Sequence, residues 1–518
     1  MTKKLVNTLL LGLLILFVSC DSKKKEDKTV QAVTPKPNIV VFYVDDLGYG
    51  DLSSYGATGV QTPNVDRLAN EGIKFTDAHS SSATCTPSRY SLLTGNYAFR
   101  NNAAVLKGDA PLIIDPSIET LPDMLKKGGY RTGVVGKWHL GLGNGDVDWN
   151  KEIKPGPLEI GFDYSFLIPS TGDRVPSVYV ENHHVINHLD KNDPIEVSYV
   201  SKFGKMPNGI DHPELLRQNA DNQHSGTIVN GISRIGFMDG GTSALWKDED
   251  FPDILTDKAI NFIDQSKDDP FFLFFSFHDI HVPRLPHERF QGKSSMGPRG
   301  DAIVQMDWMT GKVMKALEKQ NLLENTLVIF TSDNGPVLND GYEDLAEEKL
   351  GNHKPSGIYR GGKYSAYEAG TRMPTITFWK GKIAPGVSNA IWSQVDIYAS
   401  LANLIKQPIA KNTAIDSENM LPIMLSAKEQ KGRDYLLEES YTLSLRKENW
   451  KYIAPFPLNK AIPDFIEKAK NIEGGHTYEP QLYDLENDPS EKNNLASEYA
   501  EKVTELKIVL EKIKNKTN

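Results

Sequence analysis

Residues 39–50 read Ile39-Val-Val-Phe-Tyr-Val-Asp-Asp-Leu-Gly-Tyr-Gly50. The first six form an unbroken run of β-branched and aromatic residues, which is too short for a helix and typical of a parallel strand buried on both faces. The run ends at two acidic residues and a loop punctuated by glycine. The stretch therefore predicts a buried strand with carboxylates at its carboxyl end, where open parallel sheets bind their ligands.

The chain up to about residue 432 alternates such strands with amphipathic helices. Further strands are expected at residues 130–135, 271–277 and 326–330, and helices at residues 64–71, 119–127 and 302–317. This alternation predicts an α/β fold, with a large, mostly parallel sheet sandwiched by helices.

The pattern changes beyond about residue 433. Three short polar and aromatic runs predict a smaller antiparallel sheet: residues 435–438, 450–453 and 481–485. A charged amphipathic stretch at 498–513 predicts a terminal helix, for which Ser497 is a plausible N-cap. We expect a catalytic domain at residues 37–432 and a C-terminal α+β subdomain at residues 433–518.

Composition limits the possible functions. A chain of 518 residues exceeds one typical domain, which agrees with one large and one smaller unit. The formal net charge of −10 argues against a nucleic-acid partner, which would require a basic face. A polyanionic substrate must therefore be held by local lysines and arginines, because the overall field repels it.

The N-terminus resembles an export signal. Two lysines precede an apolar run at residues 5–18, which is too short for a comfortable membrane span. The run ends in Ser19-Cys20, which is similar to a lipoprotein signal at residues 1–20, so we expect lipidation of Cys20. A plain cleaved signal peptide is the alternative. Residues 21–36 are polar and lysine-rich and indicate a flexible tether. We expect an exported protein, anchored by lipid in the bacterial cell envelope (periplasm or outer membrane) or otherwise periplasmic.

A second stretch, Cys85-Thr-Pro-Ser-Arg-Tyr-Ser-Leu-Leu-Thr-Gly95, carries reactive chemistry. Pro87 suits the first turn of a helix, where unpaired backbone N–H groups and the positive end of the dipole face the Cys85 side chain. Arg89 can fold back to the same spot. These residues predict a nucleophile in a small anion-binding niche, with an ordinary loop entering a helix as the alternative. Because the only other cysteine lies in the signal, Cys85 has no disulfide partner.

Two predicted strands end in acidic or amide pairs, Asp45-Asp46 and Asp333-Asn334. Each pair alone is more typical of a turn or a helix cap. Together at one edge of a sheet they would supply four oxygen ligands and a net charge of about −3, which suits a hard divalent cation such as calcium.

The cysteine stretch resembles the signature of the type I sulfatases, members of the alkaline phosphatase-like superfamily. In that family a maturase oxidises the cysteine to formylglycine, an aldehyde whose hydrate is the nucleophile. The other family motifs occur in the family's order across about residues 38 to 374. Asp45-Asp46 precedes the cysteine stretch, and four motifs follow it: Gly136-Lys-Trp-His139, His281 before Val-Pro283, Asp333-Asn334-Gly335 and Lys363 after Arg360-Gly-Gly. Any one of them alone is typical of an ordinary loop, but six in order make a specific resemblance.

The resemblance implies roles for the nucleophile and the metal. Cys85, as hydrated formylglycine, attacks sulfur. Arg89 holds the hydrate and helps to neutralise the metal carboxylates. The resemblance favours calcium over magnesium, with four ligands: Asp45, Asp46, Asp333 and Asn334.

The resemblance also implies roles in sulfate binding and proton transfer. Lys137 and Lys363 bind sulfate oxygens. His281 or Lys363 protonates the departing sugar oxygen, and which of the two does so stays open. His139 deprotonates the remaining hydroxyl, so that sulfate leaves.

The sequence gives weaker indications of which residues form the sugar pocket. Candidates that could line it are Asp173, Arg174, Trp246, Arg284 and His287. The alternative, ordinary loop residues on a large α/β protein, has about equal weight.

These patterns together predict a sulfatase that acts on a sulfated carbohydrate. Expected partners are a sulfated glycan, a formylglycine-generating maturase and a membrane reached through the lipid anchor, with no nucleic acid. One rival is a formylglycine-dependent phosphodiester or phosphonate monoester hydrolase. The other is a non-catalytic lipoprotein that binds sulfated glycans and keeps Cys85 as a thiol.

Overall fold

The computed structural model describes residues 36–429 and 431–516. The predicted signal, Cys20 and the tether up to residue 35 lie outside these residues. Within them, none of the helices has the length and apolar character needed to cross a bilayer.

A ten-stranded sheet organises the described chain, in the order β15-β2-β14-β13-β1-β12-β4-β5-β6-β7. Its centre is parallel: β13 (Thr326–Ser332), β1 (Asn38–Val44), β12 (Phe271–Ser276), β4 (Arg131–Lys137) and β5 (Tyr164–Ile168). The flanking strands are β14 (Thr375–Phe378), β2 (Ile73–Phe75), β15 (Gly386–Ser388), β6 (Val180–Glu181) and β7 (His184–Val185). The predicted large, mostly parallel sheet is confirmed.

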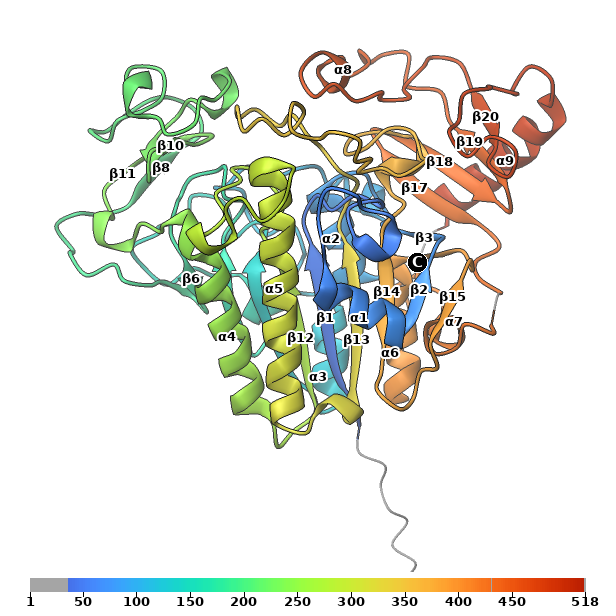
Figure 1. Cartoon of the computed structure of the whole chain (residues 1–518), viewed down its shortest axis with the longest axis horizontal. Coiled ribbons are helices and arrows are strands. Elements are labelled where there is room, and N and C mark those ends of the chain that lie inside the picture. The colour runs from blue at the N-terminus through green and yellow to red at the C-terminus, as the bar shows by residue number, and fades with distance from the viewer. Residues whose placement is uncertain (1–35, 430, 517–518) are drawn as a thin grey trace, which may run out of the picture. The chain divides into compact units, whose positions relative to one another are not determined.

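Helices cover both faces of this sheet. One face carries α1 (Pro63–Glu71), α4 (Phe251–Ser266) and α5 (Gly297–Lys319), of which α4 and α5 run side by side (Figure 1). The other carries α2 (Cys85–Thr94), α3 (Leu121–Lys127) and α6 (Ile397–Ile405). Strand β1 is buried along its whole length because alternate side chains enter the two cores: Ile39, Val41 and Tyr43 on one side, Val40, Phe42 and Val44 on the other.

The predicted helix at residues 302–317 begins five residues earlier, at Gly297. Glycine and proline at its start favour a loop in a sequence pattern, yet Pro298 fits the first turn, where its missing N–H has no intrahelical partner.

The C-terminal residues form a four-stranded antiparallel sheet: β17 (Leu436–Ser440), β18 (Thr442–Lys447), β19 (Trp450–Ile453) and β20 (Gln481–Asp484). Helix α9 (Ala500–Lys514) packs on it through Leu506 and Leu510. The predicted N-cap at Ser497 is wrong: the helix begins at Ala500, and Tyr499 precedes it without a side-chain cap. The domain boundary between residues 432 and 433 stays a prediction.

Smaller elements complete the described chain. Three two-stranded sheets pair β3 (Ala78–His79) with β16 (Trp392–Ser393), β8 (Glu196–Ser198) with β11 (Phe237–Asp239), and β9 (Ile228–Val229) with β10 (Ile232–Ser233). Two short helices are α7 (Leu421–Leu425) and α8 (Phe465–Lys468), the latter in the connection between β19 and β20.

The register of the central strands brings their carboxyl ends to one level. Val44 pairs with Ser332, Tyr43 with Ser276, and Ser276 with Gly136. The loops that follow these strands therefore meet at one sheet edge. The C-terminal sheet reaches the same region, because the backbone of Glu439 on β17 hydrogen-bonds to Ser81 and Ala83, just before α2.

Candidate active site

Cys85, the first residue of α2, is buried and lines a cavity of about 440 Å³. The Nδ1 atom of His139 lies 3.2 Å from its Sγ atom. Burial raises the pKa of the Cys85 thiol, whereas the charges of Lys137 and Lys363 act in the opposite direction. The thiol is therefore protonated and sits beside a nitrogen that can accept its proton.

His139 is held in one orientation by its surroundings. Its Nε2 atom lies 2.9 Å from the carbonyl oxygen of Leu106, and Thr86 donates a hydrogen bond to its own carbonyl at 2.9 Å. Burial, and then the charge of Lys137, lower the pKa of His139 well below its usual value, so the ring is neutral. Because a carbonyl only accepts, Nε2 carries the ring proton and Nδ1 presents a lone pair to Cys85.

Arg89 lies one turn further along α2 and is fully buried. Its Nε and Nη2 atoms donate to Oδ2 of Asp333 at 3.0 and 2.8 Å, and its Nη1 atom donates to Ser276 and to the carbonyl of Lys137. The guanidinium thus ties the start of α2 to the ends of β4, β12 and β13. Its hydrogen bonds among the described residues go to these groups and not to Cys85.

The four predicted metal ligands, Asp45, Asp46, Asp333 and Asn334, are all buried and adjacent. The amide of Asn334 donates to Oδ1 of Asp46 at 2.7 Å, and the backbone N–H of Asp46 donates to Asp333. Burial raises the pKa of Asp45 well above its usual range, and the charge of Asp333 adds to this shift. Burial also acts to raise the pKa of Asp333, but Arg89 and then Lys137 bring it below its usual value.

The donor set fits a hard cation. Oδ1 of Asp45 and Oδ1 of Asn334 are buried and have no hydrogen-bond partner among the described residues. Oxygens buried without a partner are costly, and a cation that they coordinate would remove that cost. Carboxylate and amide oxygens are the ligands that calcium prefers.

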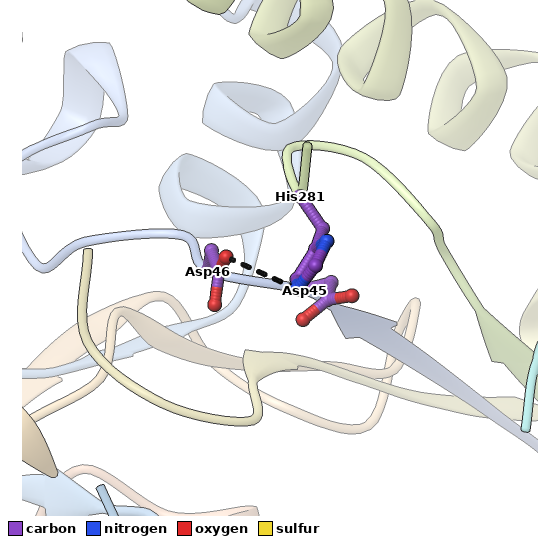
Figure 2. A group of neighbouring side chains, drawn as sticks. All are labelled: Asp45, Asp46 and His281. Atoms are coloured by element: carbon purple, nitrogen blue, oxygen red, sulfur yellow. Dashed lines mark ion pairs between the residues drawn. The ribbon is translucent and has the colours of Figure 1, made fainter. Parts of the chain in front are cut away.

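His281 extends toward the same carboxylates from the loop after β12. Its Nε2 atom lies 3.9 Å from Oδ2 of Asp46, and Figure 2 shows the ring directed at Asp45 and Asp46. Its Nδ1 atom bonds to the carbonyl of Val282 at 2.8 Å, which leaves Nε2 free. His281 also lines the cavity that holds Cys85. The ring thus adjoins both the metal cluster and the space for substrate.

Two buried lysines border the carboxylates. Nζ of Lys137 lies 2.5 Å from Oδ2 of Asp45, and Nζ of Lys363 lies 3.0 Å from Oδ2 of Asp46. Lys363 also pairs at 3.3 Å with Asp340, which itself pairs with Lys470 at 2.7 Å. Sequence reasoning missed Asp340 and Lys470.

Asp173 and Arg174 line the cavity, as the sequence suggested. Nη1 of Arg174 donates to Oδ1 of Asp173 at 2.9 Å. His224, which sequence reasoning missed, lies with Nε2 3.4 Å from Oδ2 of Asp173, while its Nδ1 lies 2.7 Å from Asp221. Burial acts to lower the pKa of His224, but the bonds to these two carboxylates raise it above its usual value. Hydrogen-bond donors on Arg174 and His224 and the acceptor carboxylate of Asp173 therefore line the cavity.

Trp246 is a correction to the predicted pocket. Its ring packs in the core against Tyr179 and Phe251, with ring centroids 5.7 and 5.4 Å apart. Burial of the large apolar ring holds this residue in the core and away from the cavity.

Arg284 and His287 are also away from the cavity. The Arg284 guanidinium donates to the carbonyls of Ile280, Val337 and Leu338 and pairs with Asp344, so its donors hold loops together. Nδ1 of His287 accepts the backbone N–H of Arg289 at the start of a short helical turn. A sequence shows that a cationic side chain is present but not that loop carbonyls already bind it.

The fold and the site define a hydrolase of anionic esters. A buried side chain at a helix N-terminus adjoins a neutral histidine, two lysines and a carboxylate cluster suited to a cation. Positive charge fixed around a nucleophile stabilises an anionic transition state.

The chain belongs to the sulfatase family. A family model described as Sulfatase matches residues 37–406. An N-acetylgalactosamine-6-O-sulfatase of Bacteroides thetaiotaomicron is 51% identical over 505 residues, 97% of each chain, and human arylsulfatase A is 32% identical over 483 residues, 90% of this chain and 84% of that one. A solved structure described under the metabolism of multiple glycosaminoglycans by Bacteroides thetaiotaomicron is 52% identical, with a TM-score of 0.90, and covers 93% of this chain and 100% of that one. The protein is therefore an enzyme that hydrolyses sulfuric esters, and the predicted family and fold class are confirmed.

Proposed function

We propose that the protein removes sulfate from a sulfated carbohydrate, and specifically the 6-O-sulfate of an N-acetylgalactosamine residue. The observation that carries this proposal is a single cavity lined by Cys85, His139 and Lys363 together with Asp173 and Arg174. Its volume of about 440 Å³ is in the range of small-molecule sites. The identity of 51% across 97% of a relative named for this activity supports the choice of sugar.

We further propose that a maturase converts Cys85 to formylglycine, whose hydrate supplies the oxygen nucleophile. An unpaired, buried thiol at the start of α2 supports this, because a sulfated thiol would have no second ionisable hydrogen with which to expel sulfate. We also propose calcium, which would act as a Lewis acid at the cluster of Asp45, Asp46, Asp333 and Asn334. The two buried oxygens without partners support a cation there.

The other residues bind the ester and move protons. Lys137 and Lys363 supply positive charge to sulfate oxygens, where it stabilises the charge that develops. His139 accepts a proton from residue 85 through Nδ1, because its Nε2 proton is committed to Leu106. Burial acts to lower the pKa of Lys363, but the charge of Asp46 raises it well above its usual value. Lys363 therefore keeps its proton. Nε2 of His281 also faces the cavity, but Nδ1 holds the proton of the neutral ring toward Val282, so Nε2 has to take up a proton before it can pass one to the departing sugar oxygen. Both side chains are in reach of that oxygen, and Lys363 already carries its proton.

We propose an exported enzyme attached to the cell envelope through a lipid on Cys20. The sequence of residues 1–20 is the support for this proposal. Such a location suits a substrate outside the cell and a maturase that acts before or during export.

The test has two parts. The mass of the tryptic peptide that contains residue 85, from protein made in its native host, should match an aldehyde in place of the thiol. Sulfate release is then measured on an oligosaccharide that carries N-acetylgalactosamine 6-sulfate, beside the matching phosphate ester, with Cys85→Ala as the control. Faster cleavage of the phosphate ester would favour the phosphodiester or phosphonate hydrolase. An unmodified thiol with glycan binding and no turnover would favour the binding protein.

A further inference from the structure

We propose that Tyr441 and Phe465 form an aromatic subsite that binds the sugar residue next to the sulfated one. The aromatic rings pack against the apolar face of that sugar. This inference rests on the proposed function, because it assumes an oligosaccharide whose sulfated residue lies in the cavity beside Cys85.

Both aromatic side chains line the cavity and remain accessible. The exposed fraction is 48% for Tyr441 and 37% for Phe465. Their ring centroids lie 6.2 Å apart at 84°, and Phe465 lies 5.5 Å from the ring of Tyr364 at 76°. Large aromatic surface left open at the wall of a binding cavity marks a ligand contact more strongly than scattered surface hydrophobics do.

The backbone at Tyr441 is unusual for an aromatic residue. Ser440 on β17 pairs with Thr442 on β18, so Tyr441 is the single residue of the turn, with φ of 52°. This left-handed conformation favours glycine or asparagine and is rare for bulky side chains. Tyr364, on the same cavity, has φ of 70°. Two strained tyrosines at one cavity indicate a function for their side chains, because glycine or asparagine would form the same turns with less backbone strain.

Tyr441 is also held in place by His476, which contacts both its ring and the preceding backbone. Nε2 of His476 lies 2.8 Å from the carbonyl oxygen of Ser440, and its ring lies 5.9 Å from that of Tyr441. Phe456 packs on the other side of His476, with ring centroids 5.8 Å apart. A ring that is already held in place loses little freedom when a ligand packs on it.

The subsite adjoins the sulfate-binding residues. Ser440, next to Tyr441, donates a hydrogen bond of 2.5 Å to the carbonyl of Tyr364, and Tyr364 follows Lys363 in the chain. Partial burial raises the pKa of Tyr441 to about 12, so its hydroxyl is neutral and can donate to a sugar oxygen. A glycan whose sulfate is held by Lys363 therefore extends across the two rings, which offer an apolar surface and one hydroxyl but no charge.

The test compares substrates of different length. Tyr441→Asn removes the ring but keeps a residue that tolerates the left-handed backbone, and Phe465→Ala removes the second ring. Each variant is assayed on N-acetylgalactosamine 6-sulfate and on an oligosaccharide that carries the same sulfated residue. We expect the ratio of kcat/KM, oligosaccharide to monosaccharide, to fall at least tenfold in both variants. An unchanged ratio in both would overturn the subsite.

A matched control comes from the same segment. Tyr478 is 43% exposed, packs on Phe456 and does not line the cavity. Tyr478→Ala should leave the ratio within twofold of the wild type, and an equal fall in this variant would overturn the assignment. Tyr441→Phe, which keeps the ring, should retain most of the ratio.

A binding measurement separates this inference from the proposed function. In a Cys85→Ala background, calorimetry measures the Kd of the sulfated oligosaccharide with and without Tyr441→Asn or Phe465→Ala. A tenfold weaker Kd supports the subsite whether or not the wild type releases sulfate, whereas missing sulfate release alone counts against the proposed reaction. An unchanged Kd, or no binding of the oligosaccharide in the Cys85→Ala background, overturns the subsite.

Discussion

The Nδ1 atom of His139 lies 3.2 Å from Sγ of Cys85, and the Nε2 atom of the same ring is bound to the carbonyl of Leu106. The two contacts fix the tautomer, because the proton on Nε2 leaves Nδ1 as an acceptor. The ring can therefore take a proton from residue 85 but has none to give it. This arrangement supports the proposed role of His139 in the step that regenerates the enzyme rather than in the step that releases the alcohol.

The first prediction concerns the proposed role of His139 as the base that acts after the alcohol has left. His139→Asn keeps a residue suited to φ of 54° and removes the basic nitrogen. Loss of a general base typically costs about 10²–10⁴-fold in rate, and here the loss should fall on turnover after the first alcohol is released. Rapid-quench assays should show about one equivalent of desulfated sugar per enzyme, followed by slow release. Equal slowing of the first and later turnovers would contradict this role.

The second prediction concerns the metal site and uses stability as its measurement. Calcium that binds only the folded protein should add about 2.7 kcal/mol at a concentration 100 times its Kd, and EDTA should remove this gain. Asp45→Asn should greatly reduce the calcium-dependent rise in Tm, because it removes one charge from the cluster. Asp115→Asn, at an exposed acid on the surface, is the control. A wild-type Tm that does not change when calcium is added would contradict the metal site.

Sequence reasoning found the residues that end the central strands because strand order and register place them. Asp45 follows β1, Asp333 follows β13 and Lys137 ends β4, so a correct view of parallel strands is enough to bring them to one edge. Their adjacency is thus a consequence of the backbone. The roles assigned to these side chains remain proposals.

The missed residues reach the cavity by long connections that carry no periodic signal. Lys470 and Phe465 lie between β19 and β20, Asp340 lies in an irregular loop, and His224 ends a single helical turn at Asn222–His224. A local pattern does not show where such a loop folds back. Trp246 shows the opposite error, because a tryptophan between two predicted elements is equally typical of a pocket and of a core.

The third prediction concerns a buried ion cluster. Nζ of Lys451 on β19 lies 3.1 Å from Glu368, 3.3 Å from Glu438 and 3.5 Å from Glu491, all of them buried. Lys451→Met should lower the free energy of unfolding by about 3–5 kcal/mol, because buried Glu491 loses the lysine it pairs with, while Glu368 keeps Arg372 and Glu438 keeps His79. Urea denaturation measures this change.

A surface pair serves as its control. Lys502 on α9 pairs with Glu505 at 2.9 Å near solvent, and Lys502→Met should change stability by no more than about 0.5 kcal/mol. If both variants unfold like the wild type, the cluster around Lys451 does not stabilise the fold.

The fourth prediction concerns pH. Burial raises the pKa of Glu439 to about 7, above a value of about 4.3 for an unfolded glutamate. The folded state therefore binds the extra proton between these values, and stability from this group falls as pH rises from about 4.3 through 7. Glu439→Gln should flatten the fall in urea midpoint between pH 5 and 8, whereas Glu498→Gln, at an exposed position, should not. A parallel pH profile for wild type and Glu439→Gln would refute the assignment.

The last prediction decides between His281 and Lys363 as the proton donor. A sugar alcohol is a poor leaving group and needs a proton as it departs, whereas a phenolate with a low pKa does not. A variant that lacks the donor should therefore lose far more activity on the sugar sulfate than on an aryl sulfate. A variant that lacks only a sulfate ligand should lose similarly on both, because the sulfate group is the same.

We expect His281→Asn to lose about 10²–10⁴-fold on the sugar sulfate but much less on an aryl sulfate with a good leaving group. The ring adjoins both the carboxylates and the cavity, and it can give a proton from Nε2 only when doubly protonated, because Nδ1 holds the proton of the neutral ring toward Val282. Lys363→Met should lose activity on both esters. Asp46 raises the pKa of Lys363 against the effect of burial, which makes the lysine a poor acid but a permanent cation. The reverse pattern, with Lys363→Met selective for the sugar ester, would assign the proton to Lys363 and leave His281 as a neighbour of the metal.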